Sequence, residues 1–154
     1  MRQTFDRRSV LGICVGGAAG AALMASSAPS YAAPTAFKAD LKGSSEVPAN
    51  TTAGTGSVTA TYDSATKELS WSGTFSGLSG PATAAHFHGP AEAGKNAGVA
   101  IWISEKGQPF PSPFKGSAKL TDAQAADLMN GQWYVNIHTA ANPGGEIRGQ
   151  LMKS

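Results

Sequence analysis

Three histidines are the residues of this chain best suited to chemistry. His86 and His88 stand one residue apart in AHFHG, and His138, the only other histidine, follows far downstream in WYVNIHT. Two histidines at i and i+2 of a strand project from one face, with Cβ atoms roughly 6.5–7 Å apart. Both rings can then converge on one ion, and a third histidine from a neighbouring strand would complete the set. Because neutral imidazole ligates copper, zinc, iron and nickel, the pattern predicts a three-histidine metal site.

A purely structural role for the same histidines stays open at this point. Surface histidines are common on strands, and one His-x-His pair is by itself a weak signal. The three rings could instead hydrogen-bond Asn136, Thr139 and backbone groups around the NPGG turn at residues 142–145.

The strands expected around the histidines place them on one polar face. Alternate side chains of a strand point to opposite sides of a sheet. Phe87 is the natural core residue of AHFHG, so both of its histidine neighbours should point away from the core. The same reasoning applies to WYVNIHT and GEIRGQL, where the apolar residues alternate with polar ones. The expected polar face holds His86, His88, His138, Glu146, Arg148, Tyr134 and Asn136.

The polar neighbours of the histidines have expected roles of their own. Glu146 is a candidate fourth ligand, or an acceptor for a histidine N–H. Glu146 and Arg148 paired at the surface would contribute little, roughly 0–1 kcal/mol. We therefore expect Arg148 to hydrogen-bond loop carbonyls and close the fold. Tyr134 and Asn136 are expected beside the ligands or a substrate, and Trp102 either packs in the core or walls the polar face.

The elements that must position these residues are predicted to be strands. No long stretch has a helical period, and short alternating runs separated by turn residues recur instead. Several of these runs are rich in β-branched and aromatic residues, as strands are. About eight or more strands at such spacing predict an all-β fold, an antiparallel Greek-key β-sandwich or barrel. The main predicted strand segments are 36–43, 56–78 (a hairpin), 98–104, 131–139 and 145–151.

One short helix is predicted to interrupt the strands. Thr121 and Gln124 in LTDAQAADLMNG fit a capping box, and Gly131 is placed to end the helix. The proline-rich stretch 106–116 is expected to be a loop, because proline removes a donor from a sheet interior.

Residues 1–32 are predicted to be a cleavable signal peptide. Three arginines precede an apolar run of small residues, and Ser30 and Ala32 suit a signal peptidase. The paired Arg7 and Arg8 favour a twin-arginine signal, with an ordinary Sec signal as the alternative. The mature protein, residues 33–154, is then expected to be a single domain in the periplasm or secreted. The only cysteine, Cys14, leaves with the signal, so no disulfide or thiolate ligand is expected.

The net charge of the mature chain limits the classes of partner that it is expected to bind. Residues 1–32 hold three of the twelve basic and one of the ten acidic residues, which leaves nine of each sign. A formally neutral domain argues against nucleic acid and against stable membrane association, because both are bound through basic patches. The expected partner is an extracellular or periplasmic protein or ligand. No G-x-S-x-G elbow is present, which disfavours a hydrolase.

Three stretches of the chain resemble the CHRD domain, a module named from chordin and found in many exported bacterial proteins. They are LKGSSEVPANTTAGTGSVTATYD, AAHFHGPAEAGKNAGVAIWI and LTDAQAADLMNGQWYVNIHTAANPGGEIRGQL. The resemblance runs from about Phe37 to Leu151. It implies an immunoglobulin-like or related β-sandwich and, in chordin-type proteins, a role in extracellular binding. The histidines, Glu146 and Arg148 all fall on positions of these motifs.

A second likeness is to copper–zinc superoxide dismutase, which is also a Greek-key β-sandwich. HFH looks similar to the His-x-His copper ligands of that enzyme, and Arg148 to the arginine that guides its anionic substrate. The bridging histidine, the zinc ligands and the disulfide cysteines have no counterpart here. The likeness implies a copper site more than it implies dismutation.

Three hypotheses on function follow. The first is an exported CHRD-domain binding protein with a three-histidine metal site, copper preferred and zinc the alternative. The second is a copper-dependent oxidoreductase with an open position opposite the histidines and Arg148 attracting an anion. The third is a metal-free extracellular adhesion or matrix module.

Overall fold

The computed structural model describes residues 33–104, 108 and 110–154. In this part of the chain nine strands form one antiparallel sheet, accompanied by one α-helix and one 3-10 turn. The predicted leader, residues 1–32 with Cys14, lies outside the described residues. The elements in chain order are β1 (Thr35–Lys42), η1 (Gly43–Ser45), β2 (Thr55–Asp63), β3 (Glu68–Ser76), β4 (Ala82–His88), β5 (Val99–Trp102), β6 (Phe114–Lys119), α1 (Asp122–Met129), β7 (Tyr134–Thr139), β8 (Ile147–Gln150) and β9 (Met152–Lys153).

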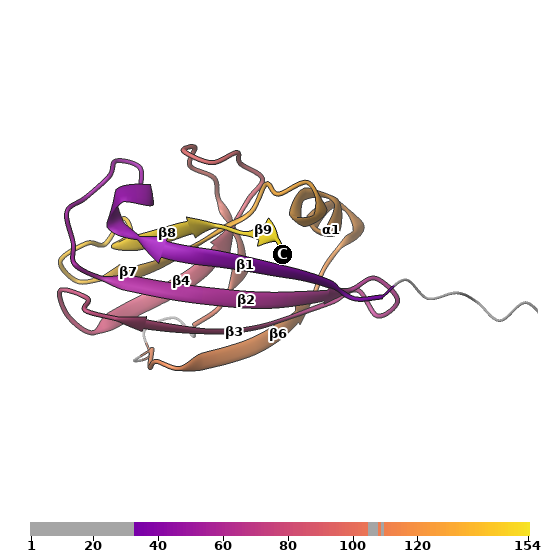
Figure 1. Ribbon diagram of the computed structural model, residues 1–154, viewed down its shortest axis with the longest axis horizontal. Helices are drawn as coiled ribbons and strands as arrows, with labels where there is room; N and C mark the ends of the chain where they lie inside the picture. Colours follow the sequence, from indigo (N-terminus) through magenta and orange to yellow (C-terminus); the bar gives the residue numbers. More distant parts are fainter. Residues whose placement is uncertain (1–32, 105–107, 109) are drawn as a thin grey trace, which may run out of the picture. The chain divides into compact units, whose positions relative to one another are not determined.

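The strands follow the order β5-β4-β7-β8-β1-β2-β3-β6, with β9 added beside β1. In Figure 1, β1, β2, β3 and β6 run along one wall while β4, β7 and β8 form the other. Trp71 of β3 and Phe87 of β4, far apart in this order, meet edge to face with ring centroids 5.1 Å apart. The sheet has therefore curled until it is nearly closed, like a barrel. The predicted all-β antiparallel fold with one short helix is confirmed, and its two walls belong to one continuous sheet.

The alternating pattern of the sequence explains which side of each strand is buried. In β1, Phe37, Ala39 and Leu41 are buried, while the lysines and aspartate between them are exposed. β2 repeats the pattern with Val58, Ala60 and Tyr62 buried between small polar residues. Because successive side chains of a strand point to opposite faces, these residues fill the interior of the curled sheet.

The helix forms where the capping signal predicts it. Thr121 Oγ1 accepts a hydrogen bond from Gln124 N at 3.2 Å, and Gln124 Oε1 accepts one from Thr121 N at 3.0 Å. These two bonds satisfy donors that the first turn of a helix leaves free. Gly131 follows the helix with φ 71°, a left-handed conformation that glycine adopts without strain. The predicted loop at 106–116 ends earlier than expected, because β6 begins at Phe114.

No helix among residues 33–104, 108 and 110–154 is long and apolar enough to cross a membrane.

Candidate metal centre

The three histidines lie on two neighbouring strands and meet on one face. His86 and His88 belong to β4, and His138 belongs to β7. His86 pairs with Asn136 and Ala84 with His138 across the ladder, so all three rings project to the same side. One ligand nitrogen from each histidine lies within 4.8 Å of the other two. His86 is 6% and His88 9% exposed, and His138 is half-buried. The predicted convergence of the histidines is confirmed.

Backbone carbonyls fix the proton positions of two of the rings. His88 Nδ1 lies 3.0 Å from Ala97 O, and His138 Nδ1 lies 3.0 Å from Pro143 O. A carbonyl oxygen can only accept, so each Nδ1 carries the proton and each Nε2 keeps its lone pair. Metal-binding histidines are oriented in this way, with the second ring nitrogen donating to a carbonyl or carboxylate.

His86 connects to this pair through His138. Its Nδ1 lies 3.1 Å from His138 Nε2, and since that nitrogen is the acceptor, His86 Nδ1 is the donor. His86 Nε2 and His88 Nε2 are buried with no hydrogen-bond partner among the described residues. A buried polar atom without a partner costs about 1–3 kcal/mol, and a metal ion would supply the partner of His88 Nε2. The 3.1 Å between His86 Nδ1 and His138 Nε2 is also close to the distance of about 3.3 Å between two nitrogens bound at 2.0–2.1 Å to one tetrahedral ion. Both atoms could therefore ligate one ion if the proton on His86 Nδ1 moved to Nε2 of the same ring.

Burial keeps the three rings neutral near pH 7. It lowers the pKa of His86 to about 4, with a smaller contribution from the charges of His138 and His88. Burial also lowers the pKa of His88 and of His138, more than the carbonyls that accept their Nδ1 protons raise it. Neutral imidazole is the form that ligates metals, so these rings need not lose a charge-bearing proton before they bind.

Aromatic rings border the cluster on two sides. The Trp102 ring stands perpendicular to the His86 ring with centroids 4.2 Å apart, and Trp102 is 49% exposed. The Tyr134 ring lies parallel to the His88 ring, with centroids 4.8 Å apart and planes 2° from parallel. Trp102 therefore borders the polar face beside His86, which is one of the two roles expected for it.

Arg148 is buried and fully engaged with the protein. Its Cζ lies 3.4 Å from the centroid of the Tyr134 ring. Its Nη1 donates to Asn96 Oδ1 at 2.8 Å and its Nη2 donates to Lys95 O, both in the loop between β4 and β5. As the sequence predicted, the arginine hydrogen-bonds a loop carbonyl and ties the fold together. Only 2% of the residue is exposed, which argues against its proposed role in attracting an anionic substrate.

Glu146 is used elsewhere than the sequence suggested. Its carboxylate accepts hydrogen bonds from Thr52 Oγ1 at 2.6 Å, Thr139 Oγ1 at 2.5 Å, and the N and Oγ of Ser79 at 2.7 and 2.6 Å. Burial raises the pKa of Glu146, but these bonds outweigh it and lower the pKa to about 2. The acceptors for the histidine N–H groups are the carbonyls of Ala97 and Pro143. Glu146 is therefore neither a histidine acceptor nor, given its four bonds, a free ligand in this structure.

The cause of this difference lies in the backbone before β8. Alternation along GEIRGQL would place Glu146 and Arg148 on one face, but β8 begins only at Ile147. Gly145 has φ 131°, and a Cβ there would lie 2.5 Å from Glu46 Oε1 and 2.6 Å from Asn136 Nδ2. The chain thus reaches Glu146 through a conformation that only glycine provides, and the strand pattern does not extend to that residue.

Asn136 and Glu46 complete the polar surroundings of the site. Asn136 pairs with His86 on one side and with Arg148 on the other, and only 3% of it is exposed. Glu46, in the loop after β1, was not among the residues singled out from the sequence. Burial raises the pKa of its carboxyl to about 7, although Arg148, the Val47 backbone and Asn136 act to lower it. A single acid in a polar loop carries no sequence signal that would have identified it.

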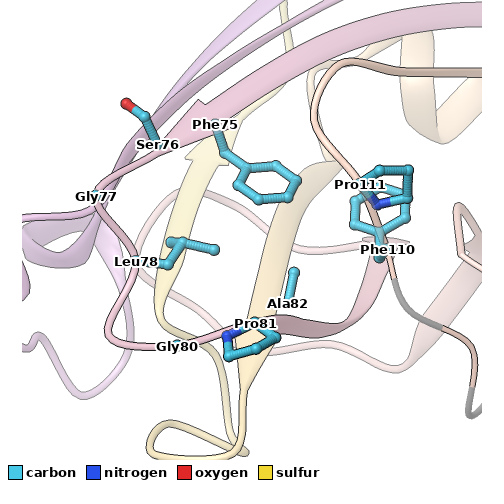
Figure 2. Close-up of a pocket in the computed structure, with 9 residues that line it drawn as sticks. All are labelled: Phe75, Ser76, Gly77, Leu78, Gly80, Pro81, Ala82, Phe110 and Pro111. Carbon is cyan, nitrogen blue, oxygen red and sulfur yellow. The ribbon is translucent and has the colours of Figure 1, made fainter.

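A separate cavity of about 320 Å³ opens beside the end of β3. Figure 2 shows the side chains of Phe75, Leu78 and Phe110 around it, together with Pro81 and Pro111. Its lining includes no histidine, so this apolar space is distinct from the candidate metal centre.

Comparison with known proteins agrees with the resemblance seen in the sequence. The profile of the CHRD domain matches residues 37–151, a range that contains every residue of the candidate centre. No curated protein and no solved structure matches the chain. Because the match covers most of its length, the chain belongs to the CHRD domain family.

Proposed function

We propose that this protein is an exported CHRD-domain binding protein whose three histidines hold one copper ion. The observation that carries the proposal is the convergence of His86, His88 and His138 with their ligand nitrogens within 4.8 Å of one another. Backbone carbonyls hold the Nδ1 protons of two of the rings, which leaves the Nε2 lone pair of His88 for a metal. The Nε2 lone pair of His138 becomes available once the proton that it accepts from His86 moves to His86 Nε2.

The donor set favours copper over the other metals that imidazole binds. All three candidate ligands are nitrogens. The carboxylate of Glu146, which the sequence offered as a fourth ligand, already accepts hydrogen bonds from hydroxyl and amide donors. Among divalent first-row metals a nitrogen site binds Cu²⁺ most tightly, so copper is preferred wherever it is available. Zinc is the alternative, and a three-histidine zinc site would add a water as its fourth ligand.

The N-terminal sequence supports the exported location in this proposal. The features of residues 1–32, an arginine pair before an apolar run of small residues, favour delivery to the periplasm or beyond the cell. Twin-arginine export would allow the metal to be loaded before translocation. The binding partner of the exported domain is then an extracellular or periplasmic protein or ligand.

Binding is favoured over catalysis by the surroundings of the histidines. An oxidoreductase needs a coordination position that its substrate can reach. Here His86 Nε2 and His88 Nε2 are buried, and Arg148 is occupied by Tyr134 and the β4–β5 loop. A redox enzyme would need a metal position that its substrate reaches, whereas a binding protein does not.

Metal analysis of the mature protein tests the proposal. The protein is purified from its own export compartment without chelators and without nickel affinity resin. We expect about one equivalent of copper in the wild type and its loss in His138→Ala. Lys67→Ala serves as the matched control, because the Lys67–Asp122 ion pair lies at the surface and belongs to other elements.

Each result of the metal measurement decides between named alternatives. Copper that persists in His138→Ala at the wild-type level would place the ion elsewhere. Stoichiometric zinc would keep the site and change the metal. Absence of any metal, with no tight uptake on titration, would overturn the proposal in favour of the metal-free binding module.

A further inference from the structure

The ring of Tyr134 is held between Arg148 and one of the candidate ligands. β7 lies between β4 and β8 in the sheet, so Tyr134 has His88 on one side and Arg148 on the other. The His88 ring is parallel to the tyrosine ring at 4.8 Å, and the guanidinium carbon lies 3.4 Å from its centroid. All three side chains are buried, with 9%, 2% and 2% exposed for His88, Tyr134 and Arg148. A buried guanidinium over a tyrosine face is a favourable cation–π contact, and burial strengthens it.

The same three residues also hold the loop between β4 and β5. Arg148 donates to Lys95 O and to Asn96 Oδ1, and the Tyr134 hydroxyl accepts from Ala97 N at 3.1 Å. His88 Nδ1 donates to Ala97 O in turn. The Ala97 carbonyl that fixes the proton of His88 therefore belongs to the same segment as Lys95 and Asn96, the two residues to which Arg148 donates.

We propose that Arg148 is a positioning residue of the metal centre, which holds His88 in its ligating orientation through the Tyr134 ring and the loop carbonyl of Ala97. The metal part of this inference rests on the proposed function, whereas the orientation of His88 does not. Without the guanidinium, the tyrosine ring loses the contact on its far face and residues 95–97 lose their anchor. The His88 ring is then free to carry its single proton on Nε2 instead of Nδ1 and to turn away from the other two histidines.

A lysine should not replace this arginine. The guanidinium is planar, stacks on an aromatic face and offers separate donors to two acceptors at once. An ammonium on a flexible stem can keep the charge but not the simultaneous contacts with Tyr134, Lys95 O and Asn96. Charge alone is therefore not what the site requires.

Two measurements on Arg148→Gln and Arg148→Lys test the inference. The first is imidazole ¹⁵N NMR of the metal-free protein, which reads the tautomer of each histidine. We expect one tautomer of His88, protonated at Nδ1, in the wild type and a mixture in both variants. The second is Cu²⁺ affinity by competition with a chelator, which we expect to fall at least tenfold in both variants. His138, whose Nδ1 partner is Pro143 O, should keep its tautomer and serves as the internal control.

A purely structural role for Arg148 predicts a different result. Both variants would melt at a lower temperature yet keep a single His88 tautomer and wild-type Cu²⁺ affinity below the melting range, and that would overturn the inference. If neither variant folds, Asn96→Ala removes one guanidinium acceptor at an exposed position and should give a smaller change of the same kind; no change there would also overturn it. If the His88 tautomer shifts in the variants but the wild type binds no copper, Arg148 still positions His88, and the proposed metal site is refuted.

Discussion

His86 Nδ1 and His138 Nε2 lie 3.1 Å apart, so two candidate ligands from neighbouring strands share a hydrogen bond. His138 Nδ1 donates to Pro143 O, which leaves the shared proton on His86 Nδ1. If His86 ligates a metal through Nδ1, this proton must leave that atom. The buried His86 Nε2, which has no partner among the described residues, can take it without any release to solvent.

Copper binding should therefore release almost no protons near neutral pH. Burial lowers the pKa of His86 to about 4 and lowers the pKa of His88 and His138 as well, so the rings are already neutral before the metal arrives. Cu²⁺ affinity should change little from pH 7.5 to 6.5 and fall at more acidic pH, where protonation of the rings, including that of His86 with a pKa of about 4, competes with the metal. Calorimetric titration in two buffers of different ionisation enthalpy measures both quantities. Release of a full proton per ion at pH 7 would contradict this arrangement.

Trp102 should report metal occupancy by fluorescence. Its ring lies against His86 with centroids 4.2 Å apart, whereas Trp71 and Trp133 are buried in the core. Cu²⁺ quenches a nearby indole, so titration should reduce emission mainly from Trp102. Trp102→Phe should remove most of the quenching while it leaves the stoichiometry unchanged, and Trp71→Phe is the matched control. Equal quenching in Trp102→Phe and the wild type would place the ion away from this ring.

The sequence predicted the histidine cluster because simple alternation holds in the strands that carry it. His86 and His88 flank the core residue Phe87 in β4, and His138 follows the core residue Ile137 in β7. Because β4 and β7 are neighbouring strands in regular register over these residues, the three rings must project to the same face of the sheet. The capping box at Thr121 was predictable for a similar reason, since it depends on two residues three positions apart.

The remainder of the site depends on contacts between distant segments, which periodicity does not reveal. Glu46 reaches Asn136 and Gly145 from a loop ninety or more residues earlier in the chain. The face expected for Glu146 is wrong because alternation does not extend to the residue before β8, which directly follows Gly145 with its positive φ. The stacking of Arg148 on Tyr134 needs the order β4-β7-β8, which the sequence alone does not give.

Glu146→Gln should destabilise the fold without weakening metal binding. The carboxylate accepts four hydrogen bonds from Thr52, Ser79 and Thr139. An amide offers one acceptor oxygen where two are used, and hydrogen bonds to a charged group contribute about 1.5–3 kcal/mol each. We expect a loss of about 3 kcal/mol in the free energy of unfolding, measured by urea denaturation. Cu²⁺ affinity of the folded variant at low temperature should match the wild type; lost affinity with intact stability would make Glu146 a ligand after all.

Glu46→Gln should make the protein more stable at alkaline pH than the wild type. Burial raises the pKa of Glu46 from 4.5 to about 7, so the folded state holds this proton more tightly than the unfolded chain. Between these two values the unfolded state binds fewer protons, and the contribution of Glu46 to stability is therefore lost as the pH rises from 4.5 through 7. Glutamine does not titrate and so avoids this loss, which is on the order of 3 kcal/mol at about pH 8 for a shift of this size.

The comparison is made by urea denaturation of the metal-free proteins at pH 5 and pH 8. The difference in unfolding free energy between Glu46→Gln and the wild type should increase in favour of the variant between these pH values. Glu68→Gln provides the matched control, because that glutamate is exposed on β3. A variant that becomes relatively less stable toward pH 8 would mean that Glu46 is ionised in the folded protein and held by Arg148, with the guanidinium stabilising it more than burial disfavours it.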